Sequence, residues 1–305
     1  MELSGIHLLL TYQCTHECDH CFVWGSPRQS GTMTVADLHD ILRQAREVGS
    51  VEWVYFEGGE PFLFYPTLLR GVRMASALGF RVGVVSNGYW AVGREDAEEA
   101  LRPLAGLVQD LSISTDLYHY EEAFSAQAAR AQAAASLLGI PLGLLSAAPP
   151  ESACAASSLG QLPNGESAVM YRGRAAAKLA ARATPRPWGG FTACPHEDLV
   201  EPGRLHVDPF GNLHICQGIV VGNLRERSLR DVCSSYRPAE HPITAPLLAG
   251  GPAELVRRYD LPHAEAYADA CHLCYEARRA LRAAFPALLA PGQMYGDAEA
   301  ASATA

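Results

Sequence analysis

Short apolar runs alternate with amphipathic segments through the first half of the chain. The runs are typical of buried strands and fall at residues 6–11, 51–56, 81–86, 107–113 and 140–145. Between them, apolar residues recur at helical spacing, which predicts helices over 35–48, 66–78, 96–104 and 119–138. Thr34 is a suitable N-cap for the first helix, and Gly49 a suitable end. A less regular sixth unit is predicted from a strand at 167–171 and a helix at 174–183.

Repeated strand–helix units predict an α/β fold with a parallel sheet and helices outside it. Small, polar or thiol side chains follow the carboxyl ends of four predicted strands, at Cys14, Gly58, Ser86 and Ser114. In parallel barrels that edge carries the active site. We therefore expect these four positions to surround one mouth.

The pattern changes near residue 185, where prolines and glycines interrupt the alternation. Residues 204–216 are typical of a hairpin with a turn at 208–212, Ser228 can cap a short helix through Val232, and a further helix is predicted after Cys274. The predicted organisation has three parts: a barrel over 1–185, a small hairpin-plus-helix metal-binding module over 186–285, and a disordered tail over 286–305.

Cys14, Cys18 and Cys21 form a C-x3-C-x2-C cluster directly after the first predicted strand. Three thiolates satisfy three irons of a [4Fe-4S] cluster and leave the fourth iron open, unlike the four-cysteine ligation of a ferredoxin. A zinc loop is the alternative, with His16 or His20 as the fourth ligand.

This spacing, with Phe22 after it, resembles the signature of radical S-adenosylmethionine (SAM) enzymes. The segment Gly58-Gly59-Glu60-Pro61 resembles the glycine-rich segment of that family. Two further pairs stand where the family places polar SAM contacts, namely Ser86 with Asn87 and Ser114 with Asp116. The resemblance covers about residues 5 to 145 and implies a partial (β/α)6 parallel barrel.

The resemblance implies that the open iron chelates the amino and carboxylate groups of SAM. An electron from the cluster then cleaves SAM to methionine and a 5′-deoxyadenosyl radical, which abstracts hydrogen from a substrate. Phe22 is expected to shield the cluster near the adenine, and the segment from Gly58 to Pro61 to bind the methionine amine. The electron donor implied is a flavodoxin or ferredoxin. Taken singly, each polar motif is equally typical of a helix cap or a turn.

A second group of cysteines comprises Cys194, Cys216, Cys271 and Cys274. With the hairpin and the closing C-x2-C pair, it resembles the SPASM and twitch auxiliary-cluster modules of the same family. Four cysteines suffice for one auxiliary [4Fe-4S] cluster, so the twitch-like form fits better. A four-cysteine zinc site is the alternative, because thiolates bind both metals. The remaining Cys154 and Cys233 are interpreted as buried or incidental thiols.

Composition restricts the partners. A net charge of −9 without a basic cluster argues against nucleic acid. The sequence shows neither a signal peptide nor a run of about 18 apolar residues, so we expect a cytoplasmic protein that does not cross a membrane. In the reducing cytoplasm, nine cysteines indicate metal-binding or catalytic thiols rather than disulfides. Only 13 residues precede Cys14, which leaves no room for an N-terminal cobalamin or peptide-binding domain and favours a small-molecule substrate, or a peptide delivered by a separate protein.

Three functions follow from these patterns. The leading hypothesis is a radical SAM enzyme with one auxiliary [4Fe-4S] cluster, and the second replaces that cluster with structural zinc. The third is a non-catalytic iron–sulfur protein for electron transfer or redox sensing. The Gly-Gly-Glu-Pro segment argues against the third, because electron transfer needs no methionine-binding loop. Tyr118 and His119 lie on the same predicted rim and are candidates to face a substrate.

Overall fold

The computed structural model describes residues 1–121, 125–153, 162 and 165–297, and its centre is one eight-stranded sheet. The strands lie in the order β5-β4-β3-β2-β1-β7-β8-β9. Their bounds are β1 Leu3–Thr11, β2 Trp53–Gly58, β3 Arg81–Ser86, β4 Asp110–Ser114, β5 Leu142–Leu145, β7 Gly203–Val207, β8 Asn212–Cys216 and β9 Ile219–Asn223. A separate two-stranded sheet pairs β6 (Arg186–Pro187) with β10 (Ala266–Tyr267) in antiparallel fashion.

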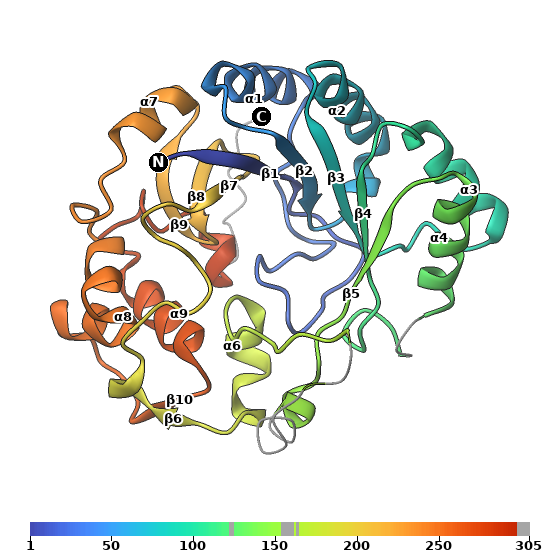
Figure 1. Cartoon of the computed structure of the whole chain (residues 1–305). Coiled ribbons are helices and arrows are strands. Elements are labelled where there is room, and N and C mark those ends of the chain that lie inside the picture. The colour runs from blue at the N-terminus through green and yellow to red at the C-terminus, as the bar shows by residue number, and fades with distance from the viewer. Residues whose placement is uncertain (122–124, 154–161, 163–164, 298–305) are drawn as a thin grey trace.

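Strands β1 to β5 pair in parallel, and the helices between them cover the outer side of the curved sheet (Figure 1). Between these strands lie α1 Val35–Val48, α2 Tyr65–Ala77, α3 Arg94–Leu101 and α4 Ala126–Leu137. The later helices are α6 Arg174–Lys178, α7 Leu229–Ser235, α8 Thr244–Arg258 and α9 Ala270–Leu281. The α/β fold with a partial parallel barrel is therefore confirmed.

Helix α1 shows how local sequence fixes an element. Thr34 accepts a hydrogen bond from the Asp37 backbone, and the Asp37 carboxylate accepts one from the Thr34 backbone, a reciprocal capping box. Gly49 ends the helix at φ 89°, a left-handed conformation that suits glycine. Leu38 and Leu42 pack into the core between helix and sheet.

Alternation along β2 gives the barrel an apolar outside and a polar inside. Val54 and Phe56 are fully buried, and Phe56 lies beside Gly71 of α2. Tyr55 and Glu57 point to the other face and line the barrel cavity. Because side chains alternate along a strand, one sequence pattern supplies both the helix-packing layer and the cavity wall.

Several predicted boundaries were wrong. Helix α4 begins at Ala126 instead of residue 119, because Ser125 caps it. His119 lies in a turn in which its amide donates to the Asp116 carbonyl. Residues 122–124 lie outside the described part. Strand β4 begins at Asp110, since the backbone turns through residues 104–108 first. The sixth strand is reduced to one parallel bridge between Ala147 and Ser167, and α6 ends at Lys178.

The predicted hairpin is present, with β7 and β8 antiparallel and the Asp208 carboxylate accepting backbone hydrogen bonds across the turn. Its β7 also pairs in parallel with β1, so the hairpin extends the barrel sheet. Strand β9 and helix α8 were not predicted. Helix α9 begins at Ala270, before both closing cysteines instead of after Cys274, because Asp269 caps its first turn.

The predicted disordered tail is wrong for residues 286–297. Leu289, Met294 and Tyr295 are buried, and the Tyr295 hydroxyl donates to the Gly218 carbonyl at 2.6 Å. Apolar side chains in this small, polar-looking segment thus pack on the β8–β9 turn. Residues 298–305 lie outside the described residues. Within the part of the chain that the structure describes, no helix has the length and apolar character needed to cross a membrane.

Candidate functional site

The first cysteine cluster lies on the loop between β1 and α1, at the carboxyl edge of the sheet. Cys14 and Cys18 are buried and Cys21 is half-buried. Backbone amides point at two of the sulfurs, from His16 to Cys14 Sγ at 3.4 Å and from Gly25 to Cys21 Sγ at 3.2 Å. These donors stabilise negative charge on sulfur, which metal ligation requires.

Burial raises the pKa of the Cys14 thiol to about 11 and raises that of Cys18 as well. Neighbouring acidic groups and thiols add to the effect for Cys18. As free thiols both would stay protonated at neutral pH. A bound cation supplies the positive charge that makes buried thiolates favourable, so metal binding and deprotonation are coupled here.

Arg174 of α6 holds this loop in place. Its guanidinium donates to the carbonyls of Cys18 and Gly25, each at 2.8 Å, and its backbone amide donates to the carbonyl of Cys21 at 2.8 Å. The side chain is only 6% exposed. No local sequence pattern indicates this role, because the arginine lies about 150 residues from the cysteines it supports.

The Gly-Gly-Glu-Pro segment packs against the cysteine loop. The amides of Gly59 and Glu60 donate to the carbonyls of Thr11 and Gln13, at 2.7 and 2.8 Å. A β-carbon on Gly59 would lie 2.0 Å from the Gln13 carbonyl oxygen, so only glycine fits this approach. Gly58 and Gly59 border the cavity that the cysteines face.

Glu60 is fully buried beneath that cavity. One carboxylate oxygen accepts from the Phe62 amide and the Ser86 hydroxyl, and the other accepts from the Asn87 amide at 2.7 Å. Burial raises its pKa to about 7, against the effect of these hydrogen bonds. Through these hydrogen bonds Glu60 fixes the conformation of the loop. Neither Glu60 nor Pro61 lines the cavity.

Asn87 connects the third strand to the cysteine loop. Its side-chain amide donates to the Thr15 hydroxyl at 3.0 Å and lies 3.0 Å from His16 Nδ1 and 3.6 Å from Cys14 Sγ. Ser86 accepts from the indole of Trp90 while donating to Glu60. Both residues line the cavity and also have structural hydrogen bonds, and their role as SAM contacts stays a prediction.

Asp116 organises the opposite rim. Its carboxylate accepts from the His119 ring at 2.8 Å and from the Tyr118 amide at 3.0 Å. Burial opposes ionisation, but the hydrogen bond and the neighbouring imidazoles hold the pKa of Asp116 below its usual range. His20 reaches the same carboxylate at 3.7 Å and stacks on Tyr118.

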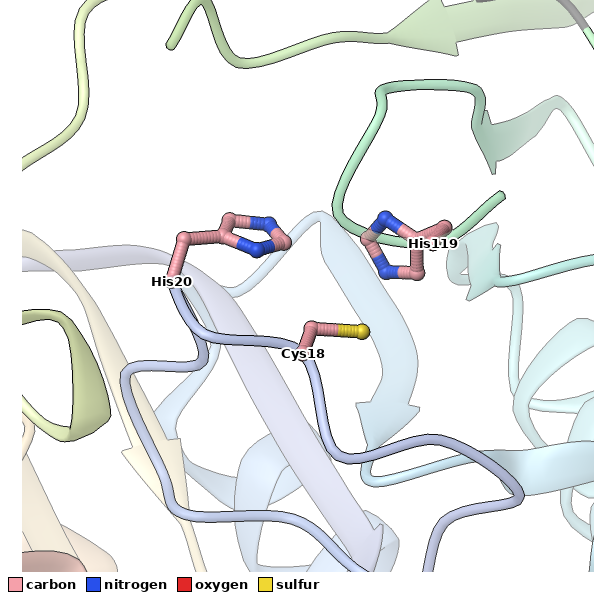
Figure 2. Close-up of side chains that lie close together, drawn as sticks. All are labelled: Cys18, His20 and His119. Atoms are coloured by element: carbon pink, nitrogen blue, oxygen red, sulfur yellow. The ribbon is translucent and has the colours of Figure 1, made fainter. Parts of the chain in front are cut away.

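Cys18, His20 and His119 bring their ligand atoms within 4.8 Å of one another (Figure 2). His20 comes from the cysteine loop and His119 from the loop after β4, and both rings lie above the Cys18 sulfur in the view. In the zinc alternative, His16 or His20 is the fourth ligand. The geometry groups His20 with Cys18 and adds His119; His16 instead contacts Asn87.

The motifs meet at one cavity of about 560 Å³. Its lining includes the following predicted residues: Cys14, Cys18, Cys21, Phe22, Gly58, Gly59, Ser86, Asn87, Ser114, Asp116 and His119. The lining also includes side chains that were not predicted, among them His7, Tyr55, Glu57, Ser112 and Arg172. The sequence contains a signal for three of these residues: His7 stands inside an apolar strand, and Tyr55 and Glu57 alternate with apolar residues along β2.

The second cysteine group also converges. Cys194, Cys216, Cys271 and Cys274 line one pocket behind the barrel, together with Arg172, Glu197 and Arg278. Arg172 Nη1 donates to Cys216 Sγ at 3.1 Å, and Arg278 donates to the Cys274 carbonyl at 3.3 Å. Burial raises the pKa of Cys194, and raises that of Cys274 to about 11. Cys233 lies apart from both groups, and Cys154 is outside the described residues.

Residues 8–126 match the family model of the radical SAM superfamily. By this match, residues 8–126 form a radical SAM domain. This match spans the cysteine loop, the Gly-Gly-Glu-Pro segment and the two polar motifs after β3 and β4. The family uses SAM and a [4Fe-4S] cluster, and a three-cysteine loop at the mouth of a partial barrel suits both.

Curated radical SAM relatives match only part of this chain. The "PqqA peptide cyclase" of Streptomyces rochei is 37% identical over 89 residues, 28% of this chain and 23% of that protein. The "S-adenosylmethionine-dependent nucleotide dehydratase" of Thermoplasmatales archaeon (strain ISO4-H5) is 31% identical over 104 residues, 34% of each protein. The matched segments thus span about a quarter to a third of these relatives.

The solved structure of BtrN in complex with AdoMet and 2-DOIA has the same fold. It superposes with a TM-score of 0.50 at 17% identity, over 76% of this chain and 82% of that one. At this identity the likeness concerns the fold alone. The partial parallel barrel fold is therefore supported over most of the chain.

Proposed function

We propose that this radical SAM protein is an enzyme that reductively cleaves SAM and abstracts hydrogen from a substrate bound in the barrel. When bound, the [4Fe-4S] cluster and SAM supply the 5′-deoxyadenosyl radical. Cys14, Cys18 and Cys21 would hold the cluster, with Arg174 fixing their loop. The observation that carries the proposal is the single cavity shared by all three cysteines, both loop glycines and the polar residues after β3 and β4.

The protein's own groups would bind and orient SAM. Carbonyls of the glycine loop would accept from the methionine ammonium, while Ser86, Asn87, Ser114 and Asp116 would meet ribose hydroxyls or the carboxylate. Phe22 would cover the cluster, with the Arg172 guanidinium 5.8 Å from its ring. The cavity walls would limit the access of water to the reactive carbon.

The cavity supports a small-molecule substrate over a peptide. Its volume of about 560 Å³ must also hold SAM, which leaves little room for a long peptide. A peptide delivered by a separate protein is the second candidate, and the likeness to a peptide cyclase favours it. The proposed electron donor is a flavodoxin or ferredoxin, and the proposed compartment the cytoplasm, where thiols stay reduced.

We propose that residues 186–285 form a twitch-like module with one auxiliary [4Fe-4S] cluster on Cys194, Cys216, Cys271 and Cys274. Tetrahedral zinc with Zn–S bonds of about 2.3 Å would need sulfurs about 3.8 Å apart. Among the described residues, the three-ligand groups within 4.8 Å are Cys18–His20–His119 and His7–Glu57–His206. No three of these four described thiols lie within 4.8 Å of one another, which supports a cluster over zinc.

The test is anaerobic reconstitution followed by reduction, addition of SAM and quantification of 5′-deoxyadenosine. The full chain should form it, Cys18→Ala should not, and Cys233→Ala should match the unaltered protein because Cys233 lies outside both groups. A content of about eight irons per chain would support the auxiliary cluster. A content of four irons and one zinc would instead show that the C-terminal cysteines hold zinc. Absence of 5′-deoxyadenosine with the cluster loaded, even with candidate substrates, would favour an electron-transfer or redox-sensing protein.

A further inference from the structure

Three ionisable side chains lie together inside the barrel, away from the cysteine loops. His7 comes from β1, Glu57 from β2 and His206 from β7, and their ligand atoms lie within 4.8 Å of one another. Glu57 Oε2 is 3.3 Å from His7 Nδ1, and Glu57 Oε1 is 3.3 Å from His206 Nε2. The three strands are adjacent, and His7 is the direct register partner of His206. A paired sheet therefore fixes all three donors.

The group forms part of the cavity wall. His7 and Glu57 line the cavity, while His206 lies behind them and is 5% exposed. The two imidazole rings are 4.9 Å apart, and Tyr55 stacks on His7 from the other side. A species bound between the three donors would be accessible from the cavity.

Hydrogen bonding alone leaves this group unsatisfied. His206 Nε2 lies 3.5 Å from the Gln217 side-chain nitrogen, at the limit of hydrogen-bond distance, and 3.3 Å from Glu57 Oε1. With the proton on Nδ1, Nε2 presents a lone pair to Glu57 Oε1, and two acceptors then face each other. Glu57 Oε1 has no hydrogen-bond partner despite the 3.3 Å contact. A cation between Nε2 and Oε1 removes that conflict.

Orphaned buried atoms collect around the same place. Glu57 Oε1, His206 Nδ1, His214 Nδ1 and Gln217 Oε1 all lack partners. Such atoms are rare in proteins and point to a bound water or ion. His214 donates from Nε2 to the Asp208 carboxylate, so its Nδ1 is an acceptor. His206 and His214 are register partners across β7 and β8, so their unpartnered Nδ1 atoms belong to side chains on the same face of the sheet.

We infer that His7, Glu57 and His206 form a binding site for a divalent transition-metal cation, with coordination positions open to the barrel cavity. Two imidazoles and one carboxylate are a donor set that such ions favour, and neither cysteine group takes part. The nearby positive charge of Arg204 is paired with Glu197 at 3.2 Å. The site needs no SAM chemistry, so it stands independently of the proposed function.

The test uses Mn²⁺ as the probe, because this hard ion prefers oxygen and nitrogen donors over thiolates. The full chain is reconstituted with iron and sulfide, freed of loose metal with a chelator, and titrated with Mn²⁺ while free Mn²⁺ is measured by electron paramagnetic resonance (EPR). We expect about one bound Mn²⁺ per chain. Glu57→Gln and His206→Ala should each weaken binding at least about tenfold, and His39→Ala, an exposed histidine on α1, should leave it unchanged.

No Mn²⁺ bound at millimolar concentration, or equal binding by the wild type and both variants, would overturn the assignment. If His206→Ala does not fold, His7→Ala on the cavity side gives the same readout, with the iron content and circular dichroism confirming an intact chain. The measurement involves no turnover. Failure of SAM cleavage would therefore leave the metal site standing, and failure to bind Mn²⁺ would leave the proposed SAM chemistry standing.

Discussion

The guanidinium of Arg172 lies 3.1 Å from the sulfur of Cys216 while its side chain also borders the barrel cavity. Arg172 is buried, and the same nitrogen donates to Glu197 at 3.2 Å. Arg278 is a second buried cation beside the C-terminal thiols. Two arginines would thus offset the negative charge of four metal-bound thiolates, and one of them joins that pocket to the barrel.

Arg172→Gln should lower the reduction potential of the proposed auxiliary cluster. A charged hydrogen bond contributes about 1.5–3 kcal/mol, which for one electron corresponds to on the order of 60–120 mV. Removing a cation next to a ligating sulfur makes the reduced, more negative cluster less favourable. Potentiometric titration followed by EPR measures the shift.

The control for that shift is Arg204→Gln. Arg204 pairs with the same Glu197 but is 42% exposed, so solvent screens its charge. A potential unchanged in Arg172→Gln, or moved equally by Arg204→Gln, would contradict the role given to Arg172.

Gly59→Ala should impair SAM binding. A β-carbon would lie 2.0 Å from the Gln13 carbonyl oxygen and 2.8 Å from that of Tyr12, so the two loops must separate. Overpacking of this kind costs about 1–3 kcal/mol. Equilibrium binding of SAM should weaken about tenfold or more, since 1.4 kcal/mol is a factor of ten.

Gly190→Ala is the matched control, because a β-carbon there meets nothing within 4 Å and its backbone is not left-handed. If Gly59→Ala bound SAM with wild-type affinity, the close packing of Gly59 against the Gln13 carbonyl would not be needed for SAM binding.

Arg174→Met should reduce iron incorporation at the first cysteine loop. The change keeps an unbranched apolar stem but leaves the carbonyls of Cys18 and Gly25 without their donors. Each buried acceptor left unpaired costs about 1–3 kcal/mol. Iron per chain and the cluster absorbance should fall, whereas Lys178→Met, an exposed cation on the same helix, should retain both. Full iron content in Arg174→Met would remove this residue from the site's support.

Glu60 should make the stability of the metal-free, SAM-free chain depend on pH. Burial raises its folded pKa to about 7 from an ordinary value of 4.5, so the folded state holds a proton that the unfolded state releases between those values. Stability should therefore fall as pH rises from 4.5 to 7, by on the order of 3 kcal/mol for a shift of this size.

Glu60→Gln should flatten that part of the profile, because the amide does not titrate. Denaturant unfolding at pH 5 and pH 8 measures the effect, and the difference between wild type and variant cancels the other titrating groups. Identical pH slopes in the two proteins would contradict the raised pKa.

The sequence was most informative where the chemistry is local. Cys14, Cys18 and Cys21 lie on one short loop, and the helix over residues 35–48 carries its own cap and stop. Boundaries were less accurate where a polar turn interrupts an apolar or alanine-rich stretch, as before β4 and α4. The β1–β7 pairing could not be read from either strand, because a parallel partner some 200 residues away leaves no mark in local pattern.

By itself, the sequence determined the parallel α/β class, the family, and the four motifs that belong at one edge of the sheet, because strand alternation and ligand spacing are written within short segments. Only the tertiary structure decided that Glu60 is buried under the loop, that Arg172 and Arg174 support the two cysteine groups, and that His7, Glu57 and His206 meet inside the barrel. These relationships join residues distant in sequence, and their partners are set by strand order and register, which no local pattern encodes.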